Sequence, residues 1–331
     1  MQWKTEIRLM LLCVLALILG TSRASADAAT EGQETRAYVV GQEESLLARY
    51  APVFVVDAND LSYNAIGTPK ANKNKRGKET VYIDPAEPAV YGGVHTFETS
   101  KGTYTNLFYR VHFERSPFTW APFNASAGHN VGFFTVITLG PGEKPYYVNT
   151  VQSCGCYHAV TPTNLLPADQ FPAGWDQSGF ENYGEHVPGI LNYPEDGNGG
   201  VRLAVFLRSG VHRARDLQML PMANIERDYD PIVAPLRPLE DLKHLPVAGG
   251  GETSLYYTKG YKRGLVKGAY KPWETVLFGL WTGDAHVGQD REYGTKDETG
   301  RLFYTTLSRS KKKASDMSDY AGFLELNGWK P

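Results

Sequence analysis

The chain has 331 residues and a formal net charge of −2, with 34 basic against 36 acidic side chains. A chain with this charge balance has no excess of positive charge with which to bind nucleic acid, so no nucleic-acid partner is expected. The 20 tyrosines, 14 phenylalanines, 34 glycines and 20 prolines favour β-strands joined by many turns. The composition therefore predicts a mainly β protein.

Residues 1–26 have the pattern of a secretory signal peptide: Lys4 and Arg8, an apolar run over 9–19, and small side chains at 24–26. The apolar run is about half of the ~20 residues that a membrane span needs, which favours cleavage over a membrane anchor. Cleavage would remove three basic and one acidic side chain and leave a net charge of −4. We therefore expect a secreted or periplasmic protein with no transmembrane segment after removal of the signal.

The mature chain is expected to have a flexible leader, 27–43, and a single β-rich domain, 44–331. The predicted fold is an antiparallel β-sandwich with long loops at one rim and short terminal helices. A polar stretch rich in Pro and Gly, 221–251, is a candidate linker or long surface excursion.

The predicted elements follow in chain order. A short helix over 44–50 ends before Pro52, and strands follow at 53–56, 81–84, 95–99, 103–114, 131–139 and 146–152. Alternation in 103–114 places His112 on the more solvated face, and the turn at 140–145 predicts a hairpin. Later elements are strands at 201–207, 255–257, 275–281 and 302–307, a turn of helix within 214–220, and a helix capped by Ser315.

The densest set of soft metal ligands is the stretch that contains Cys154, Cys156 and His158. Thiolate and imidazole ligands favour copper or zinc, and His129 or His212 could complete the coordination shell. In an oxidising compartment the two cysteines could instead form a structural or redox-active disulfide, or remain two unpaired thiols. The sequence leaves these alternatives open.

Three histidines, His129, His158 and His212, are expected at strand ends, where loops usually carry binding groups. If these ends converge on one rim, the neighbouring Arg213 and Arg215 would suit an anionic carboxylate or phosphate ligand. This arrangement predicts a Cys/His-lined site that takes a small-molecule or envelope-associated substrate.

Two further hypotheses have weaker signals. Ser153 or Ser209 could act as a nucleophile with an acid such as Asp169 or Asp216, although neither serine lies in a Gly-x-Ser-x-Gly elbow. Aromatic side chains in loop-like sequence could form a binding platform for a glycan or a lipid head group. The platform candidates are Trp120, Trp175, Tyr183 and Tyr193.

Residues 128–137, GHNVGFFTVI, followed by 207–212, LRSGVH, resemble two groups of secreted or peripheral β-sandwich proteins. These are the necrosis-inducing-like and the vacuolar-protein-sorting-like proteins, in which a Gly-x-His-type motif runs into an Asp-Trp-Glu strand. The present chain has Gly-Phe-Phe-Thr at 132–135 instead, so the resemblance does not extend to cation-dependent membrane damage. It implies a β-sandwich with His129 and His212 near one end.

Two functions are therefore expected from the sequence. The first is an exported protein whose Cys/His-lined site holds copper or zinc. The second is a non-catalytic module that binds a glycan or a lipid and whose cysteines form a structural disulfide.

Overall fold

The computed structural model describes residues 34–41, 44–121, 123–194 and 200–331. The predicted signal peptide and most of the predicted leader lie outside these ranges. The protein is mainly β, as its composition predicts, with 40% strand and 18% helix.

The larger sheet has six strands in the order β15-β5-β6-β7-β8-β9. Its central strands are long and pair antiparallel, and β7 and β8 form the predicted hairpin. The strands are β5 (Val90–Thr99), β6 (Gly102–Ser116), β7 (Gly128–Gly140), β8 (Lys144–Gln152), β9 (Ala159–Pro162) and β15 (Leu236–Pro238).

The smaller of the two main sheets has five strands in the order β13-β12-β2-β1-β14. They are β1 (Arg36–Val40), β2 (Val53–Val56), β12 (Val201–Leu207), β13 (Ala214–Pro221) and β14 (Ile232–Ala234). This sheet is mixed, because β1 pairs parallel with β14 and β2 pairs parallel with β12. The expected antiparallel pairing holds for most strands, and the parallel pairs β1–β14, β2–β12 and β5–β15 depart from it. The expected helical turn at 214–220 is wrong, since the edge strand β13 pairs along the whole of β12.

The stretch 221–251 is built into the fold and is not a free linker. It contains α3 (Met222–Tyr229), β14 and β15, and the last two each add a parallel edge strand to one of the main sheets. Three two-stranded sheets complete the β structure. They pair β3 (Thr68–Lys73) with β4 (Glu79–Asp84), β10 (Phe180–Asn182) with β11 (Glu185–Val187), and β16 (Leu245–Pro246) with β17 (Glu252–Thr253).

One hydrophobic core receives side chains from both main sheets, including Phe54 and Val205 from one sheet and Leu107 and Phe133 from the other. His112, which alternation places on the solvated face, is fully buried. The other side of the larger sheet is covered by a second core, so the middle of β6 faces packed side chains in both directions, and Asn106, Arg110 and His112 are buried there. The prediction for His112 was wrong because the sheet has no solvated face at this position.

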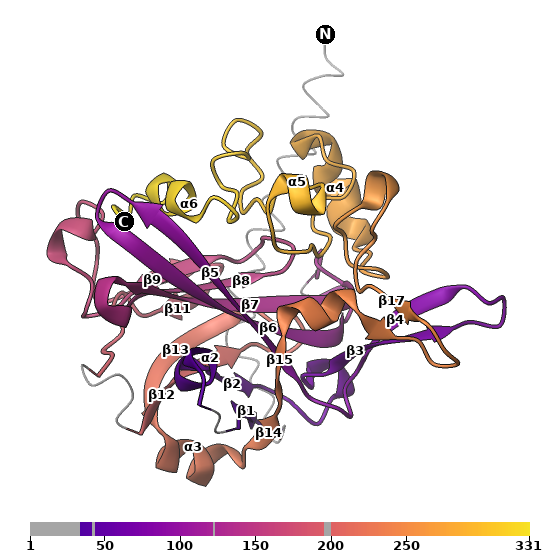
Figure 1. Ribbon diagram of the computed structural model, residues 1–331, viewed down its shortest axis with the longest axis horizontal. Helices are drawn as coiled ribbons and strands as arrows, with labels where there is room; N and C mark the ends of the chain where they lie inside the picture. Colours follow the sequence, from indigo (N-terminus) through magenta and orange to yellow (C-terminus); the bar gives the residue numbers. More distant parts are fainter. Residues whose placement is uncertain (1–33, 42–43, 122, 195–199) are drawn as a thin grey trace.

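The C-terminal segment covers that second side of the larger sheet, and Figure 1 shows it in orange and yellow on the side opposite β1, β2 and β14. Its helices are α4 (Pro272–Thr282), α5 (Lys296–Thr299) and α6 (Tyr320–Leu326). The strand expected at 275–281 is helical, because Pro272 begins α4 and Gly283 ends it with a left-handed φ of 63°. The expected strands at 255–257 and 302–307 form only isolated bridges, at Tyr256 and Tyr304. The expected C-terminal helix is α6, and its N-cap is Asp319, not Ser315. The predicted N-terminal helix is α2 (Leu46–Tyr50), capped by Ser45.

Candidate functional site

The two cysteines lie on the tight turn between β8 and β9. Cys154 is 2% exposed, Cys156 is partly exposed, and both are free. Gly155 between them has a left-handed φ of 88°, and a Cβ at this position would lie 2.0 Å from the carbonyl oxygen of Tyr304. Only glycine fits this turn.

The thiol of Cys154 donates to Gln152 Oε1 at 3.6 Å, and the interaction between the two thiols moves their pKa values in opposite directions. Burial raises the pKa of Cys154, but the hydrogen bond from Cys156 and the charge of Lys271 more than offset this, so the pKa is lowered. The same hydrogen bond, together with burial, holds the pKa of Cys156 well above its ordinary value. Of the two, Cys154 is thus the more readily ionised thiol.

The three histidines expected beside the cysteines have separate surroundings. His129 is exposed, while partly buried His158 has Nε2 3.2 Å from Asn327 Oδ1. His212 is fully buried, its ring stacks on Phe113 with 4.0 Å between the centroids, and its Nε2 lies 3.2 Å from Asn64 Oδ1. Within the described ranges, no group of three or more His, Cys, Asp or Glu side chains is arranged to hold a metal ion.

The two arginines expected to bind an anionic ligand already have carboxylate partners. Arg213 lies 2.8 Å from Glu185, which also accepts from Arg208 at 2.6 Å. Burial raises the pKa of Glu185, but hydrogen bonds from the two guanidinium groups outweigh this effect. The pKa is lowered overall, so the carboxylate stays ionised. Arg215 pairs with Asp57 at 2.8 Å.

The remaining candidates from the sequence are scattered over the fold. Ser153 is fully buried, and Ser209 accepts a hydrogen bond from Asn64. Among the four platform aromatics, Trp120 and Tyr183 are exposed, Tyr193 is buried, and Trp175 donates its indole N–H to the carbonyl of Gly189. Of the four, only Trp120 joins a larger exposed aromatic group.

Beneath α4 lies a network of buried charges that sequence reasoning missed. Lys271 and Asp290 are both fully buried, with 3.3 Å between Nζ and Oδ2. Asp290 also accepts hydrogen bonds from Ser153 Oγ and from the backbone N–H of Gly132. Burial lowers the pKa of Lys271, but Asp290 and the nearby Cys154 outweigh this and raise it well above its ordinary value.

Glu274, in the first turn of α4, also points inward. It is 5% exposed and accepts a hydrogen bond from Ser126, whose hydroxyl lies 3.2 Å from the hydroxyl of Tyr157. Gly288 gives the carboxylate its space, because a Cβ there would lie 1.5 Å from Glu274 Oε2. The charged side chains at the beginning of α4 therefore face the protein interior.

Several apolar side chains of α4 are exposed instead, whereas Leu277 and Phe278 are partly buried. Leu280 is 92% exposed, Val276 69% and Trp281 64%, although a helix on a protein surface normally buries such residues. Eight of the 12 exposed large apolar side chains among the described residues lie in two segments, 118–120 and 261–281. Six of them lie on α4 or in ring contact with it, and we call these six the apolar face: Phe118, Trp120, Trp273, Val276, Leu280 and Trp281.

Aromatic contacts join α4 to the loop before β7. Trp273 stacks on Phe118 with 5.7 Å between the ring centroids, and Trp120 lies 4.9 Å from Phe118. Phe123 contacts all three rings. The first part of the apolar face is therefore one continuous aromatic cluster.

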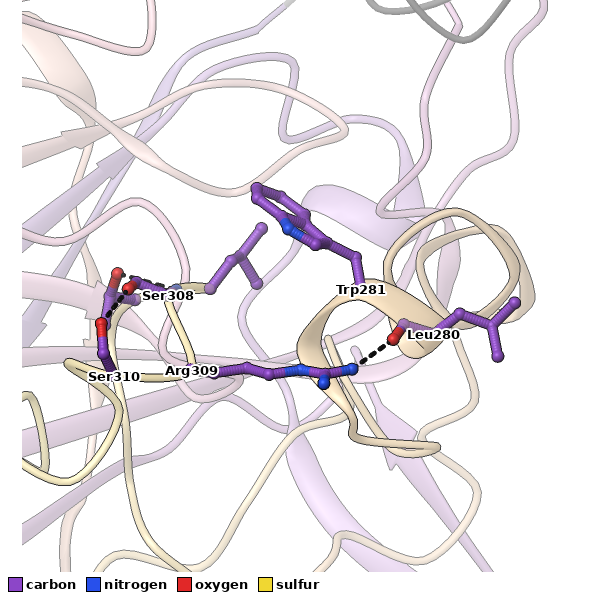
Figure 2. Close-up of a pocket in the computed structure, with 7 residues that line it drawn as sticks. Leu280, Trp281, Ser308, Arg309 and Ser310 are labelled. Atoms are coloured by element: carbon purple, nitrogen blue, oxygen red, sulfur yellow. Dashed lines mark hydrogen bonds between the residues drawn. The ribbon is translucent and has the colours of Figure 1, made fainter. Parts of the chain in front are cut away.

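Basic side chains are frequent in the sequence around α4. The segments 255–283 and 300–314 carry ten Lys or Arg residues, of which Lys271 is buried, and a single acidic residue, the inward-facing Glu274. Arg309 donates a hydrogen bond to the carbonyl of Leu280, which brings the loop containing Lys311 and Lys313 to the end of α4 (Figure 2). An open groove of about 730 Å³ lies here, lined by Leu280, Trp281 and residues 306–310.

No family model, curated protein or solved structure matches the chain. None of the helices in the described part of the chain has the length and apolarity of a membrane span. Support for a function therefore comes from the residues and contacts of the site itself.

Proposed function

We propose that this protein binds the surface of anionic lipid membranes through the apolar face. The observation that carries the proposal is the orientation of α4, which buries Glu274 and exposes Val276, Leu280 and Trp281. Exposed apolar patches of this kind mark interaction surfaces. An amphipathic helix that lies in a membrane interface buries such a face among lipid head groups and upper acyl chains.

The composition of the face favours lipid over glycan. Aromatic rings alone would suit either ligand, since sugars stack on rings and Trp and Tyr also prefer the membrane interface. Val276 and Leu280, however, offer no hydrogen bond to a sugar, whereas their burial in acyl chains removes apolar surface from water. Aliphatic side chains beside exposed tryptophans therefore support a lipid partner.

The surrounding charge supports an anionic surface. A mature chain of net charge −4 has ten basic residues in the two segments around α4, and all of them except Lys271 are at least partly exposed. Lysines near an anionic membrane contribute roughly 1 kcal/mol each. Arg309 lines the groove beside Leu280 and places its guanidinium against the carbonyl of Leu280, where a positive charge suits a phosphate-bearing head group (Figure 2).

Two finer expectations from the sequence accompany this proposal. Export to a secreted or periplasmic location would bring the apolar face to an extracytoplasmic membrane leaflet, and this inference rests on residues 1–26 alone. We also propose that the two main sheets form a β-sandwich, because both contribute side chains to one core. A copper or zinc site at Cys154 and Cys156 has less support, since each of the three candidate histidines has other neighbours.

Vesicle sedimentation tests the proposed function. The protein is mixed with phosphatidylcholine vesicles, with or without anionic phosphatidylglycerol, and the bound fraction is measured at low and high salt. We expect binding that anionic lipid strengthens and salt weakens. A double L280E/W281E substitution should weaken binding roughly a hundredfold, because each side chain gains about 1.5–3 kcal/mol from full burial.

A matched control is Val233→Glu, which changes a side chain that is 64% exposed on β14, on the opposite side of the molecule (Figure 1). It should bind vesicles as the unchanged protein does. Equal binding by L280E/W281E and the unchanged protein would contradict the proposal. Binding to soluble oligosaccharide, self-association through α4, or stoichiometric copper or zinc in place of vesicle binding would favour a glycan, a second copy or a metal function.

A further inference from the structure

We propose that Cys154 and Cys156 form a reversible dithiol–disulfide couple that exchanges with an external disulfide. This redox site is separate from the apolar face and does not depend on the proposed membrane binding. The Cys154-Gly155-Cys156 motif has no part in the proposed membrane binding.

The turn holds both cysteines in a closed loop. The backbone N–H of Gln152 donates to the carbonyl of Cys156 at 3.0 Å, and the N–H of Gly155 donates to the carbonyl of Gln152 at 2.7 Å. Only Gly155, with a left-handed φ of 88°, separates the two cysteines, so both sulfurs belong to the same tight turn. A disulfide can therefore form by local movement within this turn.

The framework around the turn is fixed. Arg291 Nη1 donates to the carbonyl of Cys154 at 3.2 Å, and the backbone of Tyr304 packs against Gly155. Ser153, next in the chain, is held by buried Asp290. Because these contacts involve the backbone or neighbouring side chains and not the sulfurs, oxidation of the thiols leaves them in place.

The two sulfurs differ in their exposure to solvent, so each takes part in a different step of the exchange. Cys156 is partly exposed, so once its thiol has lost its proton to solvent it attacks an external disulfide, forms a mixed disulfide and releases one thiol. Because the pKa of Cys156 is raised, this step is faster at alkaline pH. Cys154, 2% exposed, then attacks the Cys156 sulfur and displaces the second thiol. The external disulfide is reduced to two thiols, the cysteine pair is oxidised, and the two protons of the pair pass to the released thiols.

The test uses the full mature protein in glutathione buffers that range from fully reduced to fully oxidised. Samples are quenched with acid and alkylated, and free thiols are counted by mass spectrometry. We expect one transition from two free thiols to none, with the loss of two hydrogens, no lasting glutathione adduct, and full reversal by dithiothreitol. Since the unchanged protein is measured, the result does not depend on a variant that folds.

Two variants separate the roles of the sulfurs. Cys154→Ser leaves the accessible thiol without its partner and should accumulate a glutathione adduct at Cys156. Cys156→Ser should form its adduct roughly tenfold more slowly, because reactivity requires access. The proposal is overturned if the unchanged protein keeps two free thiols in oxidised glutathione, stops at an adduct or an intermolecular dimer, or stays oxidised in reduced glutathione.

Discussion

The strands of the larger sheet and helix α4 bury opposite kinds of side chain. Leu107 in β6 is fully buried among apolar neighbours, whereas Leu280 in α4 is 92% exposed and the charged Glu274 lies inside. The comparison teaches that packing partners decide which side of an element is buried. Buried Lys271 and Glu274 hold the beginning of α4 against the interior, and Val276, Leu280 and Trp281 are left exposed.

The most direct way to break this arrangement is to remove Lys271. Lys271→Met leaves Asp290 buried without a counter-charge, which should lower the free energy of unfolding by about 3–5 kcal/mol. Chemical denaturation measures the change. The matched control is Lys267→Met, whose lysine lies nearer solvent 3.9 Å from Glu79 and should cost less than about 1 kcal/mol. Equal losses in the two variants would show that the buried pair does not hold α4.

Two identical substitutions sharpen the comparison between the sheet and the helix. Leu107→Ala should destabilise the protein by about 2–5 kcal/mol, because it opens a cavity in the shared core. Leu280→Ala should change stability by no more than about 0.5 kcal/mol, because the side chain contacts mostly water. Thermal unfolding of both variants measures the difference. A loss of stability in Leu280→Ala as large as that in Leu107→Ala would mean that the helix packs its apolar face internally.

The smallest expected effect concerns polar groups buried within the sheet region. Burial lowers the pKa of His212 to about 3, so the folded protein keeps it neutral while the unfolded chain takes up a proton below about 6.5. Stability should therefore fall as the pH decreases from 7.5 to 5.5, by roughly 1 kcal/mol for this histidine. His112 and His158, whose pKa values burial also lowers, act in the same direction.

The variant His212→Asn tests this assignment, since asparagine tolerates the left-handed φ of 49° at this position. It should lower the melting temperature at pH 7.5 but make its pH dependence between 7.5 and 5.5 shallower. An unchanged slope would assign the pH dependence to other groups.

Local patterns predicted much of the β structure. The run Val201–Leu207 is β12 over the same residues, and the turn at 140–145 joins β7 to β8. The local sequence pattern predicted the wrong element where contacts with distant parts of the chain determine the backbone conformation. Residues 214–220 became a strand because β12 pairs with them, and 275–281 became a helix although Val, Phe and Trp favour strands. Pro272 and Gly283, at the two ends of α4, were the signal that could have identified it.

The site was less predictable than the fold. The sequence identified Cys154 and Cys156 because both lie on one short turn. It gave no reason to pair Lys271 with Asp290 or to place Glu274 inside, since those contacts depend on how separate segments pack. The histidines failed to gather around the cysteines for the same reason: strand ends converge only if the strands are neighbours with suitable register.

The segment that carries β14 and β15 has a consequence for how the chain folds. Within 232–238 it adds the last strand to one main sheet and then the last strand to the other, and the carbonyl of Pro235 between them accepts from Val90. Its partners β1 and β5 are made much earlier during synthesis, so both sheets must wait with an open edge until this segment leaves the ribosome. Long-range pairing of this kind slows folding and exposes strand edges to aggregation. A chain truncated before residue 232 would keep both edges open permanently.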